Sequence, residues 1–308
     1  MLIELARAVA ATGYRFVTPT PATHARVNAR PGNAWARDLR DVLGWSRPFR
    51  AEILPPGLFA LMRDAGILHA DGSGWRSDLR LSSLGDLMFF HSAYPTVAAD
   101  SVFFGPDTYR FARAIEAALA CRQAPVARIV DIGCGAGPGA ILAARLRPEA
   151  EVIAVDINPA ALRLTEVNAT LAGVRVTARL SDLLTNAPGQ FDLIVSNPPY
   201  LVDPSARAYR HGGGPLGADL SLAIVRAARG RLAPGGTLLL DTGAVIVGGE
   251  DPFRSAALDI VRTAGLSWTY EEVDPDVFGE ELNEQPYGNA DRIAAVVLAV
   301  TRTDHNGE

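Results

Sequence analysis

The 308-residue sequence predicts an α/β protein with a mostly parallel sheet, preceded by a smaller, mainly helical region. From residue 125 onward, short aliphatic runs alternate with longer amphipathic stretches, the pattern of strands and helices in an α/β sheet. Runs such as Leu238-Leu239-Leu240 are continuously apolar, as expected of strands covered on both faces. The first 120 residues lack this alternation and instead carry helical spacing followed by short β-like runs.

Residues 1–98 are predicted to form an accessory domain, and residues 99–308 the α/β domain. In the first part, apolar spacing predicts helices at 2–12, 34–43 and 56–65, and a small hairpin from strands at 75–81 and 87–91. Helices followed by a hairpin favour a winged-helix-like arrangement. A strand at 101–104 comes next, and a helix is predicted from the Gly-Pro-Asp-Thr segment at 105–108 to residue 119, because proline and an acid suit a first helical turn.

The α/β part is predicted to contain seven strands, at 127–132, 151–156, 174–180, 191–196, 236–241, 267–273 and 293–300. Helices are predicted at 139–146, 159–172 and 218–232. The last helix is expected to end at Ala233-Pro234-Gly235-Gly236, since proline removes a donor and glycine accepts positive φ.

Composition excludes several classes of protein. With 48% apolar and 20% charged residues the chain is not disordered, and no apolar run approaches the ~20 residues of a membrane helix. The first residues lack the layout of a secretion signal, so a cytoplasmic protein without a membrane partner is expected. Neither Cys121 nor Cys134 has a second ligand at metal-binding spacing, and no metal is expected.

The charge distribution disfavours a nucleic-acid partner. Residues 1–121 hold 13 arginines against 11 acidic residues, whereas residues 122–308 hold 16 against 23. Binding to nucleic acid depends mainly on neutralising phosphates, for which an acidic second half is a poor surface.

Acidic residues recur where three successive predicted strands end. The segment 131–139 (DIGCGAGPG) follows the first strand, and its glycines let the backbone turn tightly and approach a ligand. Asp156 ends the next strand, where a carboxylate can accept hydrogen bonds from both hydroxyls of a ribose. Asp182 follows the third strand, where it can accept a hydrogen bond from the amino group of an adenine. Each of these acids alone is more often a helix cap, but together with Asp131 they predict a nucleoside-type ligand at the carboxyl edge of the sheet.

The tetrapeptide Asn-Pro-Pro-Tyr at 197–200 follows the fourth strand. Its simplest interpretation is a proline turn that ends the strand. The two prolines also make the backbone rigid, so the Asn197 side-chain oxygen and the Pro198 carbonyl can converge on one planar NH₂ group. The Tyr200 ring can stack on that group and stabilise positive charge.

These motifs resemble those of class I S-adenosylmethionine (SAM)-dependent methyltransferases. Segment 131–137 resembles their first motif, and Asp156 and Asp182 match their ribose and adenine acids. The resemblance covers about residues 100–300 and implies a Rossmann-like seven-stranded sheet whose last strand is antiparallel. It implies that Asp131 lies near the amino group of the methionine moiety. The remaining implied cofactor contacts are Gly133, Gly135, Gly137, Ile157, Leu183 and Asn197.

The tetrapeptide resembles the signature of the branch that methylates planar nitrogens, which includes methyltransferase small domains and protein-glutamine methyltransferases. It implies catalytic roles for Asn197, Pro198 and Tyr200, a small-molecule or protein acceptor, and S-adenosylhomocysteine as product. Segment 103–109 (FFGPDTY) lies where glutamine-directed enzymes carry a proline and acid-threonine segment, but departs from it in its aromatic residues. Tyr94, Phe104 and Tyr109 are therefore the candidates to line the acceptor pocket.

Three other functions compete with this interpretation. A SAM cyclase of the azetidine-2-carboxylate synthase type would use the same cradle and release methylthioadenosine. An RNA or DNA adenine methyltransferase is less favoured because of the charge distribution. A nicotinamide dehydrogenase fits the G-x-G-x-x-A pattern from Gly135 to Ala140, but Asp131 lies too close to a pyrophosphate position and hydride transfer does not need the tetrapeptide.

Overall fold

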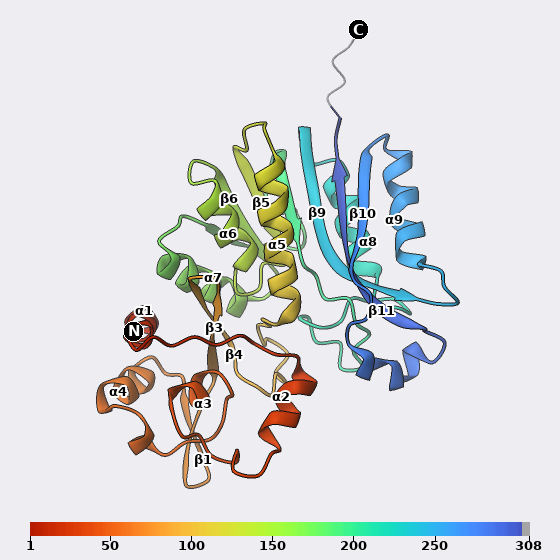
Figure 1. Cartoon of the computed structure of the whole chain (residues 1–308). Coiled ribbons are helices and arrows are strands. Elements are labelled where there is room, and N and C mark those ends of the chain that lie inside the picture. Colours follow the sequence, from red (N-terminus) through yellow and green to blue (C-terminus); the bar gives the residue numbers. More distant parts are fainter. Residues whose placement is uncertain (304–308) are drawn as a thin grey trace.

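The computed structural model describes residues 1–303 and contains a seven-stranded sheet between two layers of helices (Figure 1). The strands are β5 (Arg128–Ile132), β6 (Glu151–Asp156), β7 (Thr177–Leu180), β8 (Phe191–Ser196), β9 (Leu232–Ile246), β10 (Ser267–Asp274) and β11 (Arg292–Thr301). Their order across the sheet is β10-β11-β9-β8-β5-β6-β7. Strands β5 to β9 pair in parallel, and β11, the last in the chain, is antiparallel to both of its neighbours. The predicted fold class is confirmed.

Alternate residues of each strand supply the two faces of the sheet, because successive side chains point to opposite sides. Ile129 packs with α5 (Pro106–Cys121) and α6 (Pro138–Leu146). Its neighbour Val130 packs with α8 (Asp219–Arg229) and α9 (Pro252–Thr263) on the other face. Helix α7 (Pro159–Ala172) lies beside α6.

The N-terminal region packs on α7 rather than forming a separate core. It contains α1 (Leu2–Ala10), α2 (Pro21–Asn28), α3 (Leu39–Leu43), η1 (Ala51–Ile53), α4 (Pro56–Asp64), β1 (Leu68–Asp71), β2 (Gly74–Ser77), β3 (Leu79–Leu84) and β4 (Leu87–Ser92). Leu5 and Phe90 of this region share one buried apolar cluster with Leu164 of α7. The boundary after residue 98 stays a prediction.

Two N-terminal predictions were wrong in detail. The predicted strand 75–81 is two strands: β2 pairs with β1, which was not predicted, and β3 pairs with β4 around Gly85. The pairing partner changes at Asp78, whose N–H donates to the Ile67 carbonyl (2.8 Å) while its carbonyl accepts from the Ala93 N–H (2.9 Å). The predicted helix 34–43 starts only at Leu39, since the Asp38 carboxylate caps it by accepting from the Asp41 N–H (2.8 Å).

Differences in the α/β part arise from turns and bulges. Segment 101–104 is not a strand: Val102 exchanges only one backbone hydrogen bond with Ser92, and the chain then turns into α5. Helix α8 ends at Arg229 instead of residue 232, and Pro-Gly-Gly at 234–236 lies inside β9, where the β8–β9 register shifts. Helix α2, capped by Thr20, and helix α9, capped by Asp251, were not predicted.

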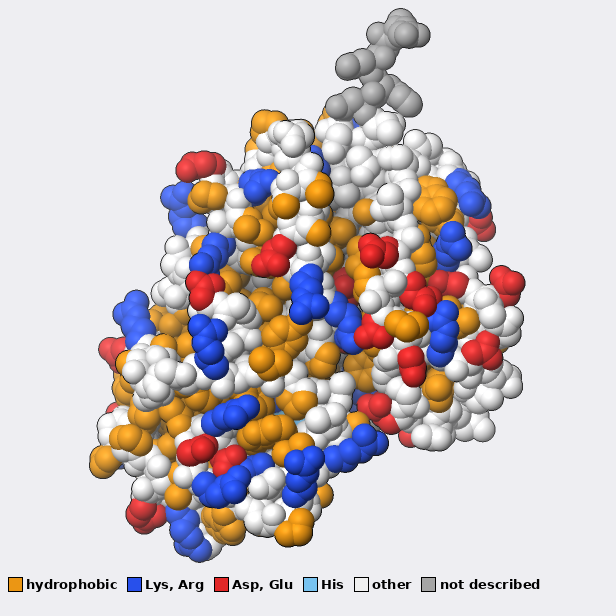
Figure 2. All heavy atoms as spheres, viewed as in Figure 1, with side chains coloured by type: hydrophobic (Ala, Val, Ile, Leu, Met, Phe, Trp, Pro, Cys, Tyr) orange, Lys and Arg blue, Asp and Glu red, His pale blue; other side chains and the backbone are white. Residues whose placement is uncertain are grey.

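Charge is unevenly distributed over the surface. On the face in Figure 2, arginine side chains are spread over the N-terminal part, and many acidic side chains lie over the C-terminal half. Within residues 1–303 no helix is long and apolar enough to span a membrane.

One buried amide joins the N-terminal region to the loop after β5. Asn168 of α7 is fully buried, and its Oδ1 accepts from the Phe90 N–H (2.9 Å). Its Nδ2 donates to the carbonyl oxygens of Phe90 (3.0 Å) and Ala136 (2.9 Å). Strand β4 and the glycine loop are therefore held by the same side chain.

Replacing this amide by an isosteric apolar group should destabilise the whole protein. Asn168→Leu leaves buried backbone groups of Phe90 and Ala136 without partners, so we expect a loss of about 2–4 kcal/mol in the free energy of unfolding. Thr170→Ala, on the exposed face of the same helix, should change it by less than about 0.5 kcal/mol. Denaturant unfolding monitored by circular dichroism measures both, and equal effects of the two substitutions would contradict the role of Asn168.

Candidate functional site

A cavity lies where the carboxyl ends of β5, β6, β7 and β8 meet. Most of the predicted cofactor and catalytic residues line it: Asp131, Gly133, Gly135, Asp156, Ile157, Asp182, Leu183, Asn197, Pro198 and Tyr200. The start of α5, segment 101–103 and residues 208–210 complete its wall. The parallel sheet thus brings together side chains that are up to 69 residues apart in the chain.

The glycine loop makes its turn in the left-handed region, where side chains are strained. Gly133 has φ 69° and Gly135 has φ 55°. The Gly135 N–H donates to Asp156 Oδ2 (2.9 Å), and Oδ1 of the same carboxylate accepts from the Asn158 N–H (2.8 Å). Burial raises the pKa of Asp156. The carboxylate at the end of β6 therefore both holds the loop and borders the cavity.

Gly137, predicted to contact the cofactor, is not among the residues that line the cavity. It has φ 83° and precedes α6, and a Cβ there would lie 2.9 Å from the Thr165 side chain of α7. Its small size serves packing between the loop and α7, and its contact with the cofactor stays a prediction.

Asp131 is almost completely buried at the floor of the cavity. Its Oδ2 accepts from the Ala140 N–H (2.8 Å) in the first turn of α6. Burial raises the pKa of this carboxyl to about 7. The group therefore changes its charge near neutral pH.

Two residues after β7 form the far end of the cavity. Asp182 is exposed and Leu183 has φ 46°, an unusual conformation for a non-glycine residue. The Ser181 hydroxyl stabilises this turn by donating to the Leu183 carbonyl (3.0 Å) and accepting from the Asn186 N–H (2.9 Å). Ile157, after β6, is 58% exposed at the cavity and presents an apolar surface to it.

Tyr200 is buried, and its hydroxyl donates to Asp107 Oδ2 (3.0 Å) in the first turn of α5. Arg110 then links Asp107 (2.9 Å) to Asp274 of β10 (2.6 Å). Burial and then the nearby Asp107 raise the pKa of Tyr200 well above its usual range. Asp107 was predicted at a helix start and, by resemblance, in the proline and acid-threonine segment of glutamine-directed enzymes, but its contact with Tyr200 was not predicted.

The three aromatic residues predicted to line the acceptor pocket are not among the residues that line this cavity, and their contact with an acceptor stays a prediction. Tyr94 stacks on His24, with ring centroids 4.1 Å apart. Phe104 is 1% exposed and packs on Phe89. The Tyr109 hydroxyl accepts from the Thr18 N–H (3.0 Å).

Besides Tyr200, four other aromatic residues line the cavity: Phe103, Phe111, Tyr209 and Phe278. The rings of Phe103 and Tyr209 are nearly parallel, with centroids 6.5 Å apart. Neighbouring residues of an extended chain point in opposite directions, so Phe103 faces the cavity while Phe104 enters the N-terminal core.

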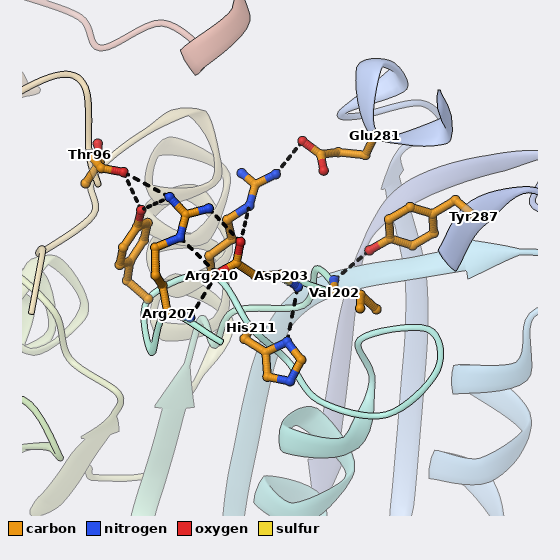
Figure 3. A network of polar contacts seen from close by, with 9 residues as sticks. Thr96, Val202, Asp203, Arg207, Arg210, His211, Glu281 and Tyr287 are labelled. Atoms are coloured by element: carbon orange, nitrogen blue, oxygen red, sulfur yellow. Dashed lines mark hydrogen bonds and ion pairs between the residues drawn. The ribbon is translucent and has the colours of Figure 1, made fainter. Parts of the chain in front are cut away.

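The loop after the tetrapeptide is organised by Asp203, which is 3% exposed (Figure 3). Its carboxylate accepts from Nε (2.9 Å) and Nη2 (2.6 Å) of Arg207, and this hydrogen-bonded arginine lowers the pKa of Asp203 to about 2. Arg207 and Tyr209 both donate to the Thr96 carbonyl, at 3.3 and 2.5 Å. The loop is thereby attached to the segment that precedes α5.

The same loop is attached to the C-terminal part of the chain (Figure 3). Arg210 forms an ion pair with Glu281 (2.5 Å) of η2 (Gly279–Asn283). The Val202 N–H donates to the hydroxyl of Tyr287 (2.7 Å) in η3 (Gln285–Tyr287). These contacts hold residues 208–210 against the cavity. This segment was not singled out from the sequence, and the glycines at 212–214 are the neighbouring signal that could have found it.

Comparison with known proteins agrees with this geometry. The family model of the methyltransferase small domain matches residues 116–244, which include the glycine loop and the tetrapeptide. The release factor glutamine methyltransferase of Cereibacter sphaeroides is 38% identical over 211 residues, which are 64% of this chain and 70% of that protein. The ribosomal protein uL3 glutamine methyltransferase of Bordetella pertussis is 39% identical over 131 residues, covering 38% of this chain and 44% of that relative.

Among solved structures, Trm5b of Pyrococcus abyssi matches with a TM-score of 0.51 and 16% identity, covering 77% of this chain and 62% of that one. This likeness supports the fold alone. The sequence relatives and the family model go further, and they confirm the resemblance inferred from the motifs. The chain belongs to the class I S-adenosylmethionine-dependent methyltransferases, in the branch of methyltransferase small domains and protein-glutamine methyltransferases, and it is an enzyme that uses S-adenosylmethionine.

Proposed function

We propose that this enzyme methylates the side-chain amide nitrogen of a glutamine in a protein, with a release factor or a ribosomal protein as the first candidates. The observation that carries the proposal is the Asn-Pro-Pro-Tyr segment bordering the same cavity as the glycine loop. A glutamine amide is a planar NH₂ group, for which such a segment is suited. The two relatives described above are both named for glutamine methylation, one of a release factor and one of a ribosomal protein.

The residues at the sheet edge suit a ligand with an ammonium group, a ribose and an adenine. We assign Asp131 to the ammonium group, Asp156 to the ribose hydroxyls and Asp182 to the adenine amine. The left-handed turn at Gly133 leaves open space where a Cβ would stand, so a ligand can approach the backbone closely. When bound, S-adenosylmethionine supplies an electrophilic methyl group on a sulfonium.

The acceptor amide is oriented by the tetrapeptide. The Asn197 side-chain oxygen and the Pro198 carbonyl accept one hydrogen each from its NH₂ group, so the nitrogen lone pair points along the line of transfer. The Tyr200 ring packs on the flat face of the amide and stabilises developing positive charge. Phe103 and Phe278 exclude water from this part of the cavity.

Two alternatives are less well supported. A cyclase that converts S-adenosylmethionine itself would need no acceptor site, and none of the relatives described above is named for that chemistry. A nucleic-acid acceptor is disfavoured because residues 122–308 contain 23 acidic residues and only 16 arginines, a poor surface for neutralising phosphates.

The purified enzyme is incubated with methyl-labelled S-adenosylmethionine and, separately, a bacterial release factor, ribosomal protein uL3 or total RNA. We expect label on a protein, located to a glutamine by peptide mass mapping, with S-adenosylhomocysteine as by-product. Label on RNA alone would instead identify a nucleic-acid methyltransferase. Methylthioadenosine without any labelled acceptor would identify a cyclase.

Binding of S-adenosylmethionine should depend on pH through Asp131. Because burial raises its pKa to about 7, this carboxyl is neutral in more acidic solution and must lose a proton before it can pair with an ammonium group. Below about pH 7 the affinity should therefore rise with pH, by at most about tenfold per pH unit, and above it the affinity should level off. Calorimetric titrations on both sides of neutrality measure this, and Asp131→Asn should bind more weakly and lose this component of the pH dependence. An unchanged profile in that variant would contradict the assignment.

Removing the Asn197 amide should affect turnover more than cofactor binding. We expect Asn197→Ala to lower kcat by on the order of a hundredfold, because the acceptor nitrogen loses its orientation, while affinity for S-adenosylmethionine stays within a few-fold. The exposed Asn289 provides a matched control, since Asn289→Ala should leave both quantities unchanged. Equal losses of affinity and turnover in Asn197→Ala would place this residue in the cofactor cradle instead.

A further inference from the structure

The ring of Tyr200 lies directly on the backbone of β9 at Gly243. A Cβ built on Gly243 would lie 2.0 Å from Cδ2 and 2.2 Å from Cε2 of the ring, distances that no real side chain tolerates. The φ of Gly243 is not positive, so its backbone conformation does not require glycine. The position requires glycine because the tyrosine ring occupies the space of a side chain.

The other end of the ring is fixed by Asp107. This carboxylate is 5% exposed and accepts the Tyr200 hydroxyl proton at 3.0 Å. Its second oxygen accepts from Arg110 (2.9 Å), and Arg110 is itself held by Asp274 (2.6 Å). Asp107 therefore has no freedom to turn away from the hydroxyl.

Asp241 lies two residues before Gly243 on the same face of β9. Burial raises the pKa of Asp241 well above its usual range, with a smaller contribution from the nearby Asp107. Burial likewise raises the pKa of Asp107, whose Oδ1 accepts from Arg110 while its Oδ2 accepts from the Tyr200 hydroxyl.

We propose that Gly243 and Asp107 are positioning residues that set the place and tilt of the Tyr200 ring at the cavity. The inference rests on the proposed role of Tyr200 in orienting a planar acceptor. Neither residue needs to touch the acceptor: Gly243 provides a flat support for the ring, and Asp107 fixes its hydroxyl. Disturbing either one displaces the ring while the cofactor residues of β5 and β6 remain in place.

The first test is a double-mutant cycle between Gly243 and Tyr200. With the acceptor found for the wild-type enzyme, Gly243→Ala should lower kcat by about tenfold or more and leave the affinity for S-adenosylmethionine within about twofold. In a Tyr200→Ala background the added methyl group has no ring to displace, so the same substitution should cause no further loss. Losses that multiply, as for independent sites, would overturn the proposal.

The second test addresses Asp107 and does not depend on the tolerance of β9 for alanine. Asp107→Ala should lower kcat in the wild-type background but not further in Tyr200→Phe, which already lacks the hydroxyl. Asp107→Asn, whose side-chain oxygen still accepts a hydrogen bond, should recover part of the loss. An Asp107→Ala effect of the same size in both backgrounds would show that Asp107 acts independently of Tyr200.

A third readout needs no acceptor. In enzyme with ¹³C-labelled tyrosine rings, the Tyr200 signals are assigned from their loss in Tyr200→Phe. A ring held at both ends should flip slowly and give separate signals for the carbons on its two edges. Asp107→Ala should speed up the flipping and merge these signals. Gly57→Ala, on an open face of α4, and Asp86→Asn, in an exposed ion pair with Arg145, should change neither the signals nor kcat.

Failure of the two proposals can be told apart. If the wild-type enzyme methylates no glutamine, the proposed function fails while the ring signals still test the positioning. If it methylates glutamine, and kcat and ring signals are unaffected by both Gly243→Ala and Asp107→Ala, only the positioning inference fails.

Discussion

The site depends on the left-handed turn that follows β5. Three side chains hold it: Asp156 accepts from the Gly135 N–H, Asn168 donates to the Ala136 carbonyl, and Asp131 accepts from the Ala140 N–H. These residues come from β6, α7 and β5. Without these contacts the loop would lose the conformation that presents bare backbone to a ligand, and the cavity would lose its floor.

The same contacts connect the cofactor side to the N-terminal region. Asn168 bonds to Phe90 of β4 as well as to the loop, so the packing of the first hundred residues on α7 bears on the cofactor site. Across the cavity, Arg207 and Tyr209 reach the Thr96 carbonyl from the loop after the tetrapeptide. The N-terminal region is thus attached both to the glycine loop and to the loop that follows the tetrapeptide, on two sides of the cavity.

Much of the fold could be predicted because its signals are local. Strands β6 and β8 and helix α7 have the predicted bounds, since their apolar runs end at acids, prolines or an Asn cap. The N-terminal region was harder to predict, because short helices such as α3 and hairpins such as β1–β2 depend on single capping or turn residues. The bulge in β9 shows the same limit: Pro-Gly-Gly at 234–236 is an equally good helix stop and strand bulge, and only pairing with β8 selects the bulge.

The sequence by itself determined the α/β class, the glycine loop, the acids at successive strand ends and the tetrapeptide, because each is a property of neighbouring residues and of a parallel sheet's common carboxyl edge. Only the tertiary structure decided which aromatic residues face the cavity. Phe103 and Phe104 are neighbouring phenylalanines that differ only in the side to which they point. It also decided the contacts of Tyr200, whose hydroxyl meets Asp107 across 93 residues of chain. Such contacts join elements distant in sequence, and they arise only when the sheet has set those elements side by side.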